Sequence, residues 1–138
     1  MSGETYQSHG SVVARVDVVM RNSYSMEIRA RDRAEPFTTK DGSTIRELVR
    51  AANQTLAEAT LEPGQQTQRH YHAESEELYY LLAGEGEMEV DGELAAVGPG
   101  DAIVIPPGAW HQITAGDSEL RFLCCCAPGY THADTFFT

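Results

Sequence analysis

The chain has 138 residues, of which 41% are hydrophobic and 22% are charged. This length and composition are typical of one soluble domain that can fold without disulfide bonds or a structural metal. Ten Lys and Arg residues stand against 21 Asp and Glu residues, which gives a formal net charge of −11. So acidic a chain argues against nucleic acid or an anionic membrane as partner, because phosphate binding requires a basic surface.

The first part of the chain carries little pattern. We treat residues 1–36 as an N-terminal segment and residues 37–138 as one domain with a C-terminal tail. Residues 11–20 are rich in Val, which favours a strand over a short helix. No signal sequence or membrane span is expected, because the apolar runs of this segment are too short for either.

Two interpretations remain open for the next part of the chain. A β-hairpin is predicted over residues 37–49, with its turn at residues 40–42. Residues 44–59 also place apolar side chains at helical spacing, and Thr44 with Glu47 could form a capping box. Two strands with a short break between them fit the same residues, and periodicity alone does not choose between helix and strands.

The pattern beyond residue 76 indicates an all-β domain. Short runs with the character of strands alternate with turns rich in Gly and Pro, which is typical of a sandwich or a barrel. Asp91-Gly92 is the signal of a two-residue hairpin turn. The predicted strands are 77–83, 86–90, 93–97, 101–105, 111–115 and 119–127.

The three Cys residues are consecutive, Cys124, Cys125 and Cys126. An odd number in a single run is not a disulfide framework, so we expect a reducing compartment and a cytoplasmic location. We interpret the run as a β-strand with small side chains. A metal or redox role is less favoured, because metal-binding Cys residues are usually spaced by two or more residues.

Three His residues and one Glu form a candidate metal site. His70 and His72 flank Tyr71, so in a strand both imidazoles project from the same face. Glu77 opens the next predicted strand and could return to the same pocket. His111 follows a tight Pro-Pro-Gly turn that could direct a third imidazole there. A His-x-His pair is weak evidence alone, but together these side chains form a ligand set for a transition metal.

The spacing of Gly and Pro around these residues strengthens the prediction. The first motif is Gly64, His70, His72, Glu77 and Gly84, and the second is Gly100, Pro106, Gly108 and His111. In both motifs the sequence resembles the cupin superfamily. In length it resembles the small single-domain cupins, some of which are similar to the cupin domain of type II mannose-6-phosphate isomerase. One departure is Ala115, where the family often has an Asn that is not a metal ligand.

The resemblance implies a double-stranded β-helix, a jelly-roll-like barrel of two antiparallel sheets, with a metal ion held by His70, His72, Glu77 and His111. It also favours strands over a helix for residues 44–59. Small cupins commonly pair through the N-terminal strand and the outer sheet. Because the apolar residues 12–20 belong to no motif, we expect a C2 homodimer in which they are covered.

Three imidazoles and one carboxylate would leave two positions of an octahedral ion open for ligands. One divalent transition metal is therefore the expected cofactor, and Fe, Mn, Ni, Cu, Co and Zn all suit this set. The expected function is that of an oxygenase, or of an isomerase or lyase, acting on a small polar metabolite. The alternative is a non-catalytic protein that uses the metal to bind a sugar or a carboxylate.

Strand alternation predicts which side chains share the pocket with the ligands, namely Gln68, Tyr79 and Leu81, while Leu78 and Tyr80 face out. Tyr79 could orient a ligand or donate a proton, or be a half-buried barrel residue. Arg46 could clamp a carboxylate or phosphate near the mouth, although a solvated charge is more common there. Trp110 is expected to face away from the metal.

Three other residues compete for a role as metal ligands. Glu76, one residue before Glu77, breaks the motif spacing. His9 and His132 lie outside both motifs, so none of the three is expected to bind the metal.

Overall fold

The structure is a computed structural model that describes residues 4–8, 11–15 and 26–137. The chain divides into two compact units, Met1–Ala34 and Glu35–Thr138. In the described part of the chain, no helix is both long and apolar enough to cross a membrane.

The first unit contains a small antiparallel sheet of β1 (Glu4–Ser8) and β2 (Ser11–Arg15) and a 3-10 turn, η1 (Arg31–Arg33). Strand β2 agrees with the strand favoured for this stretch, whereas the sequence pattern predicts no strand at β1. The remainder of that stretch, residues 16–20, lies outside the described residues.

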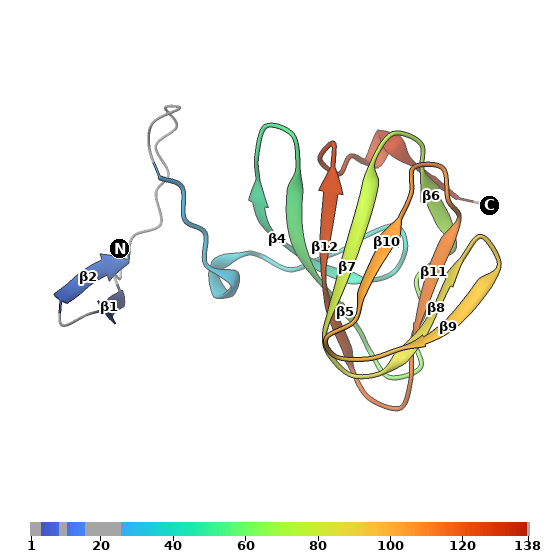
Figure 1. Cartoon of the computed structure of the whole chain (residues 1–138), viewed down its shortest axis with the longest axis horizontal. Helices are drawn as coiled ribbons and strands as arrows, with labels where there is room; N and C mark the ends of the chain where they lie inside the picture. Colours follow the sequence, from blue (N-terminus) through green and yellow to red (C-terminus); the bar gives the residue numbers. More distant parts are fainter. Residues whose placement is uncertain (1–3, 9–10, 16–25, 138) are drawn as a thin grey trace. The chain divides into compact units, whose positions relative to one another are not determined.

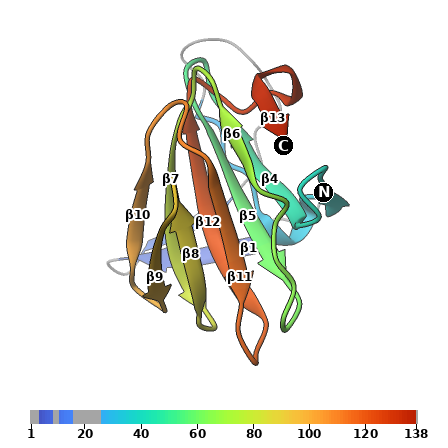
Figure 2. The same cartoon turned by 90° about the vertical axis from the view of Figure 1, so that its right-hand side faces the viewer.

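The second unit consists of two antiparallel sheets that lie face to face (Figures 1 and 2). One sheet has the strand order β10-β7-β12-β5-β4-β3 and the other β13-β6-β11-β8-β9. The predicted all-β fold of two antiparallel sheets is confirmed. The first sheet contains β3 (Phe37–Thr38), β4 (Thr44–Arg50), β5 (Thr55–Leu61), β7 (Glu76–Ala83), β10 (Ala102–Ile105) and β12 (Leu120–Ala127). The second contains β6 (His70–His72), β8 (Gly86–Val90), β9 (Glu93–Val97), β11 (His111–Ala115) and β13 (Thr135–Phe137), which follows the 3-10 turn η2 (His132–Asp134).

The segment 44–59, for which helix and strands both fit the sequence, forms strands β4 and β5 and no helix. They pair with each other, and β5 also pairs along its whole length with β12. The backbone N–H and C=O groups of β5 form hydrogen bonds to strands on both sides, so they cannot also form the hydrogen bonds of a helix. The helical spacing of the side chains therefore does not decide the structure.

Two turns show why Gly occupies its positions. Strands β8 and β9 are joined by the predicted two-residue turn, Asp91 and Gly92, whose φ angles of 48° and 86° are typical of a type I′ hairpin. Gly84, between β7 and β8, has a φ of 79°, and a Cβ atom there would overlap the carbonyl oxygen of Glu119. Gly84 therefore provides both a left-handed backbone and room for a close approach of two chain segments.

The hydrophobic core fills the space between the two sheets. Its largest fully buried side chains include Leu61, Leu81, Ile113 and Phe122. The opposite face of β7 points outward, because Leu78 and Tyr80 are almost half exposed, as alternation predicts.

Candidate metal centre

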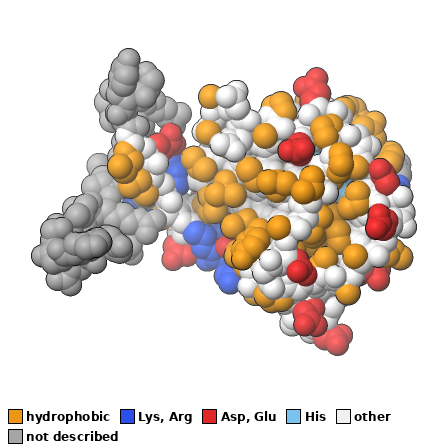
Figure 3. All heavy atoms as spheres, viewed as in Figure 1, with side chains coloured by type: hydrophobic (Ala, Val, Ile, Leu, Met, Phe, Trp, Pro, Cys, Tyr) orange, Lys and Arg blue, Asp and Glu red, His pale blue; other side chains and the backbone are white. Residues whose placement is uncertain are grey.

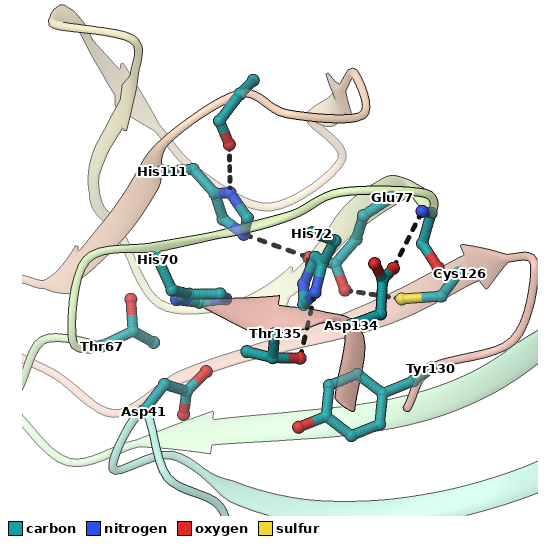
Figure 4. Close-up of polar contacts among 12 residues, drawn as sticks. Asp41, Thr67, His70, His72, Glu77, His111, Cys126, Tyr130, Asp134 and Thr135 are labelled. Atoms are coloured by element: carbon teal, nitrogen blue, oxygen red, sulfur yellow. Dashed lines mark hydrogen bonds and ion pairs between the residues drawn. The ribbon is translucent and has the colours of Figure 1, made fainter. Parts of the chain in front are cut away.

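Four side chains from the two sheets converge on one point (Figure 4). His70 and His72 come from β6 and His111 from β11, which pairs with β6 at His111 and His70. Glu77 comes from β7 in the other sheet. All four are buried, and their potential ligand atoms lie within 4.8 Å of one another. The four side chains thus converge, as the two sequence motifs predict, and the cluster bridges the two sheets through Glu77 alone.

The atoms that face the middle of this cluster lack ordinary partners. Glu77 Oε1 lies 3.3 Å from His111 Nε2 and 3.5 Å from His72 Nε2. Among the described residues, neither Glu77 Oε1 nor His111 Nε2 has a hydrogen-bond partner, although both atoms are buried. Buried polar atoms without partners are rare in proteins, and a shared metal ion would satisfy these two together.

The outer nitrogens of two imidazoles are held by backbone carbonyl groups. His70 Nδ1 lies 2.7 Å from the carbonyl oxygen of Gln68, and His111 Nδ1 lies 3.0 Å from that of Ala109. Because a carbonyl oxygen only accepts, Nδ1 of each ring must carry the hydrogen. Each neutral ring then presents the lone pair of Nε2 to the cluster, which is the tautomer that a metal ligand needs.

The third imidazole is oriented by a hydroxyl group. His72 Nδ1 lies 3.2 Å from Thr135 Oγ1, and Thr135 Oγ1 donates to the carbonyl oxygen of Thr131 at 3.0 Å. With its hydrogen used in that bond, the Thr135 hydroxyl can accept from His72 Nδ1. His72 therefore also directs the lone pair of Nε2 inward.

The carboxylate of Glu77 is oriented by a thiol. Cys126 Sγ donates to Glu77 Oε2 at 2.9 Å, which leaves Oε1 free to face the cluster. Burial, followed by the charge of Glu77, raises the pKa of the Cys126 thiol far above its ordinary value, so the S–H donor is retained. The Cys run is a strand as predicted, but the contact of Cys126 with the candidate ligand Glu77 is not anticipated from sequence.

The side chains of the cluster shift one another's pKa values. Burial alone would raise the pKa of Glu77, but the nearby imidazoles of His111 and His72 outweigh burial and lower it well below its ordinary value. Burial alone would lower the pKa of His72, but Glu77 outweighs it and raises the pKa. For His70, burial and then the nearby His111 lower the pKa. Glu77 is thus a carboxylate that stabilises positive charge beside it.

A cavity of about 670 Å³, which includes space open to solvent, adjoins the cluster. Of the predicted pocket residues, Tyr79 lines it and is almost fully buried. Leu81 faces into the barrel but belongs to the hydrophobic core rather than to the cavity wall. Gln68 is exposed and is not part of the wall, because β6 begins only at His70 and alternation does not extend back to residue 68.

The structure also places Arg46 away from the cavity wall. Its neighbours Ile45 and Glu47 both line the cavity, so the Arg46 side chain leaves β4 on the opposite face. The sequence-based expectation of an anion clamp at this position therefore has no counterpart in the wall.

Trp110 faces away from the cluster, as expected. Its ring packs edge-on against Tyr71 at a centroid distance of 4.6 Å, and the guanidinium of Arg69 lies 5.2 Å from the ring centroid. His132 is exposed in η2 and is not part of the cluster.

Glu76 and Ala115 are not part of the cluster. Glu76 is exposed on β7, while its neighbour Glu77 belongs to the buried cluster. His9 lies outside the described residues. At the position where cupins often have Asn, Ala115 is buried and its backbone N–H donates to the carbonyl oxygen of Gln65.

The C-terminal residues contribute contacts that the sequence motifs do not include. Besides Thr135, the carboxylate of Asp134 accepts backbone hydrogen bonds at 3.0–3.1 Å from residues 73–75, in the turn between His72 and Glu77. Tyr130 lines the cavity next to the cluster. No spacing signal links these residues to the motifs, because the contacts depend on how β13 pairs with β6.

Comparison with known proteins identifies the family. A model of the cupin domain matches residues 57–126. The uncharacterized protein MJ1618 of Methanocaldococcus jannaschii is 46% identical over 110 residues, which cover 75% of this chain and 88% of that protein. The chain belongs to the cupin family.

More distant similarities agree with this assignment. The 5-aminosalicylate 1,2-dioxygenase of Comamonas sp is 39% identical over 59 residues, which cover 43% of this chain but 16% of that enzyme. The solved structure of Streptomyces Pac13, a nucleoside dehydratase, has a TM-score of 0.71 at 19% identity, covering 83% of this chain and 92% of Pac13. The expected cupin jelly roll is thereby confirmed.

Proposed function

We propose that this cupin binds one divalent transition-metal ion through His70, His72, Glu77 and His111, and that it is an enzyme acting on a small polar metabolite. The observation that supports the proposal is that the two ends of each candidate ligand have different surroundings. The outer atom of every ligand is held by a hydrogen bond, whereas its inner atom faces the shared centre. Such outer contacts are the ones that orient metal ligands in proteins.

A divalent ion bound here would act as a Lewis acid, or as a redox centre if the metal is redox-active. The chain's own residues would bind and orient the substrate beside it. Burial raises the pKa of Tyr79 well above its ordinary value, and burial also raises that of Tyr130. Both phenols therefore stay protonated at neutral pH and can donate hydrogen bonds to a ligand in the cavity.

Two reaction classes remain candidates within this proposal. The partial similarity to a dioxygenase supports an oxygenase. An isomerase or lyase would use the same site without consuming oxygen. The alternative function, metal-dependent ligand binding without turnover, would use the same cavity.

Metal analysis of the purified protein tests the proposal. The protein is purified without added metal and then incubated separately with Fe, Mn, Ni, Cu, Co and Zn in divalent form. It should retain one ion per chain with at least one of these metals. Failure to retain any of these ions would overturn the proposal. Oxygen uptake by the Fe(II) form during a metabolite screen would support the oxygenase. Turnover without oxygen uptake would support the isomerase or lyase, and a thermal shift without turnover would support the binding protein.

Replacement of Cys126 tests the orientation of Glu77. Cys126→Ala removes the donor to Glu77 Oε2, so metal affinity should fall about 10- to 100-fold. Cys126→Ser restores a donor and should recover most of the affinity. Cys125→Ala on the same strand is the matched control, because its thiol contacts Gln54 rather than the cluster. Competition with a chelator measures all three, and equal affinities for the Ala and Ser variants at position 126 would contradict the prediction.

Metal affinity should fall as the pH is lowered. A free His side chain has a pKa of about 6.5, and Glu77 raises the pKa of His72 above that value. As the pH falls, His72 therefore begins to bind a proton at a pH above 6.5, and this proton competes with the metal. We expect a loss of about tenfold in affinity per pH unit for each proton displaced. Chelator competition between pH 8 and pH 5.5 measures the slope, and an affinity independent of pH would contradict it.

The outer face of the larger sheet supports the proposal of a homodimer. Leu78 and Val104 are opposite each other in the pairing of β7 with β10, and they are 44% and 60% exposed. Figure 3 shows hydrophobic side chains gathered over this face. Light scattering should give the mass of a dimer at micromolar concentration, and Val104→Lys should convert it to a monomer. Leu94→Lys on β9 is the control, because Leu94 is as exposed as Val104 but belongs to the other sheet. A monomeric native protein would exclude this assembly.

A further inference from the structure

Asp41 is held rigidly in the turn between β3 and β4. Its Oδ1 atom accepts hydrogen bonds from the hydroxyl of Thr39, from the backbone N–H of Ser43 at 2.8 Å and from the hydroxyl of Ser43 at 2.6 Å. The backbone carbonyl of Asp41 also accepts from the N–H of Gln68 at 2.7 Å. These bonds tie the turn to the segment that leads into the His-bearing strand β6, so the carboxylate has a fixed position.

The second carboxylate oxygen of Asp41 is available to a ligand. In the part of the chain that the structure describes, no hydrogen bond is made to Oδ2, whereas Oδ1 accepts three. Asp41 lines the same cavity as His70 and Tyr130, and Figure 4 shows its carboxylate between His70 and the Tyr130 hydroxyl. A donor group on a bound molecule could therefore reach Oδ2.

Among the described residues, the cavity wall contains no Lys or Arg, so positive charge near Asp41 can come only from the imidazoles of the His cluster or from a metal ion that they bind. Its other carboxylates are Glu77, which belongs to the His cluster, and Glu47, which pairs with Arg50 at 2.7 Å. Apolar rings supply much of the rest of the surface, including Phe37 and Phe137. The Asp41 carboxylate adds negative charge on its side of the cavity, which attracts hydrogen-bond donors and cations and opposes the attraction of a bound metal ion for anions.

We propose that the cavity binds a small neutral or cationic molecule whose hydroxyl or ammonium group donates to Asp41 Oδ2, while another part of the molecule faces the His and Glu cluster. This inference rests on the proposed metal-dependent function and specifies its substrate class. Asp41 is then the residue that determines specificity against carboxylate and phosphate ligands.

A series of three-carbon probes tests the proposal on protein loaded with Co(II). The probes are 1-amino-2-propanol, 1,2-propanediol and lactate, which share a carbon skeleton but are cationic, neutral and anionic. Changes in the cobalt absorption spectrum report binding without any need for turnover. Because the cobalt ion itself attracts the carboxylate of lactate, the readout is the change in the affinity for each probe when the charge of Asp41 is removed.

Two variants isolate the charge of Asp41. In Asp41→Asn, the side-chain oxygen can keep the bonds of Oδ1 while the charge is lost, so lactate should bind about tenfold more tightly and the amine more weakly. Asp101→Asn removes one charge from an exposed turn outside the cavity and should change neither. If Asp41→Asn does not fold, Asp41→Ser provides the same comparison, because a Ser hydroxyl can also accept from the backbone N–H of Ser43.

Several results would overturn the specificity proposal. They are unchanged affinities for lactate and the amine in the Asp41 variant, and no binding of any probe by protein with one cobalt per chain. A chain that takes up no cobalt or other divalent metal would instead contradict the proposed metal-dependent function, so the two failures are distinguishable.

Discussion

Replacement of His72 by alanine should remove the bound metal, abolish turnover and leave the barrel folded. The substitution deletes one of the four inner ligand atoms, and the buried cluster has no other described His, Cys, Asp or Glu at ligand distance to replace it. The barrel should persist because its core, which includes Leu61 and Ile113, does not include His72.

Metal content and the far-UV circular dichroism spectrum measure both parts of this prediction. His132→Ala is the matched control, because His132 is exposed in η2 and outside the cluster, and its metal content should equal that of the native protein. Stoichiometric metal and full activity in His72→Ala would show that the ligand assignment is wrong.

Replacement of Gly84 by alanine should cause a large loss of stability. The φ angle of 79° is unfavourable for alanine, and the new Cβ would also overlap the Glu119 carbonyl and lie 3.1 Å from Leu120 Cα. Because these are backbone atoms of a neighbouring segment, they cannot rotate away as a flexible side chain would. We expect the free energy of unfolding to fall by about 3 kcal/mol or more.

Gly64→Ala separates the two causes of this loss. Gly64 also has a positive φ, 75°, but a Cβ there would have no heavy atom within 4 Å. Only the backbone strain remains, so the loss should be about 1 kcal/mol. Urea unfolding of both variants measures the difference, and equal losses would contradict the steric explanation for Gly84.

The strands and the four clustered side chains could be predicted because their signals are local or belong to a fixed motif. His70 and His72 share a face in any strand, and Gly and Pro mark the turns between the later strands. Residues 44–59 differ, since their helical spacing is as good locally as their strand pattern. Only the pairing of β5 with β12, which lies far along the chain, selects strands.

The residues that surround the cluster could not be predicted, because their contacts depend on long-range register. Cys126 reaches Glu77 across 49 residues of sequence, and Thr135 reaches His72 across 63. Arg46 and Gln68 lie outside the cavity wall, because a prediction from alternation fails where the start of the strand or its inward face is not known. Alternation is informative only once the bounds and orientation of a strand are known.

The hydrogen bonds made by Asp134 and Thr135 have a consequence for the order in which the protein is made. A nascent chain synthesised as far as His111 already contains all four candidate ligands. It lacks β12, which separates β7 from β5 in the larger sheet, and it lacks the groups that orient His72 and the turn before Glu77. The hydrogen bonds that fix the geometry of the cluster are therefore completed only after residue 135 has been synthesised.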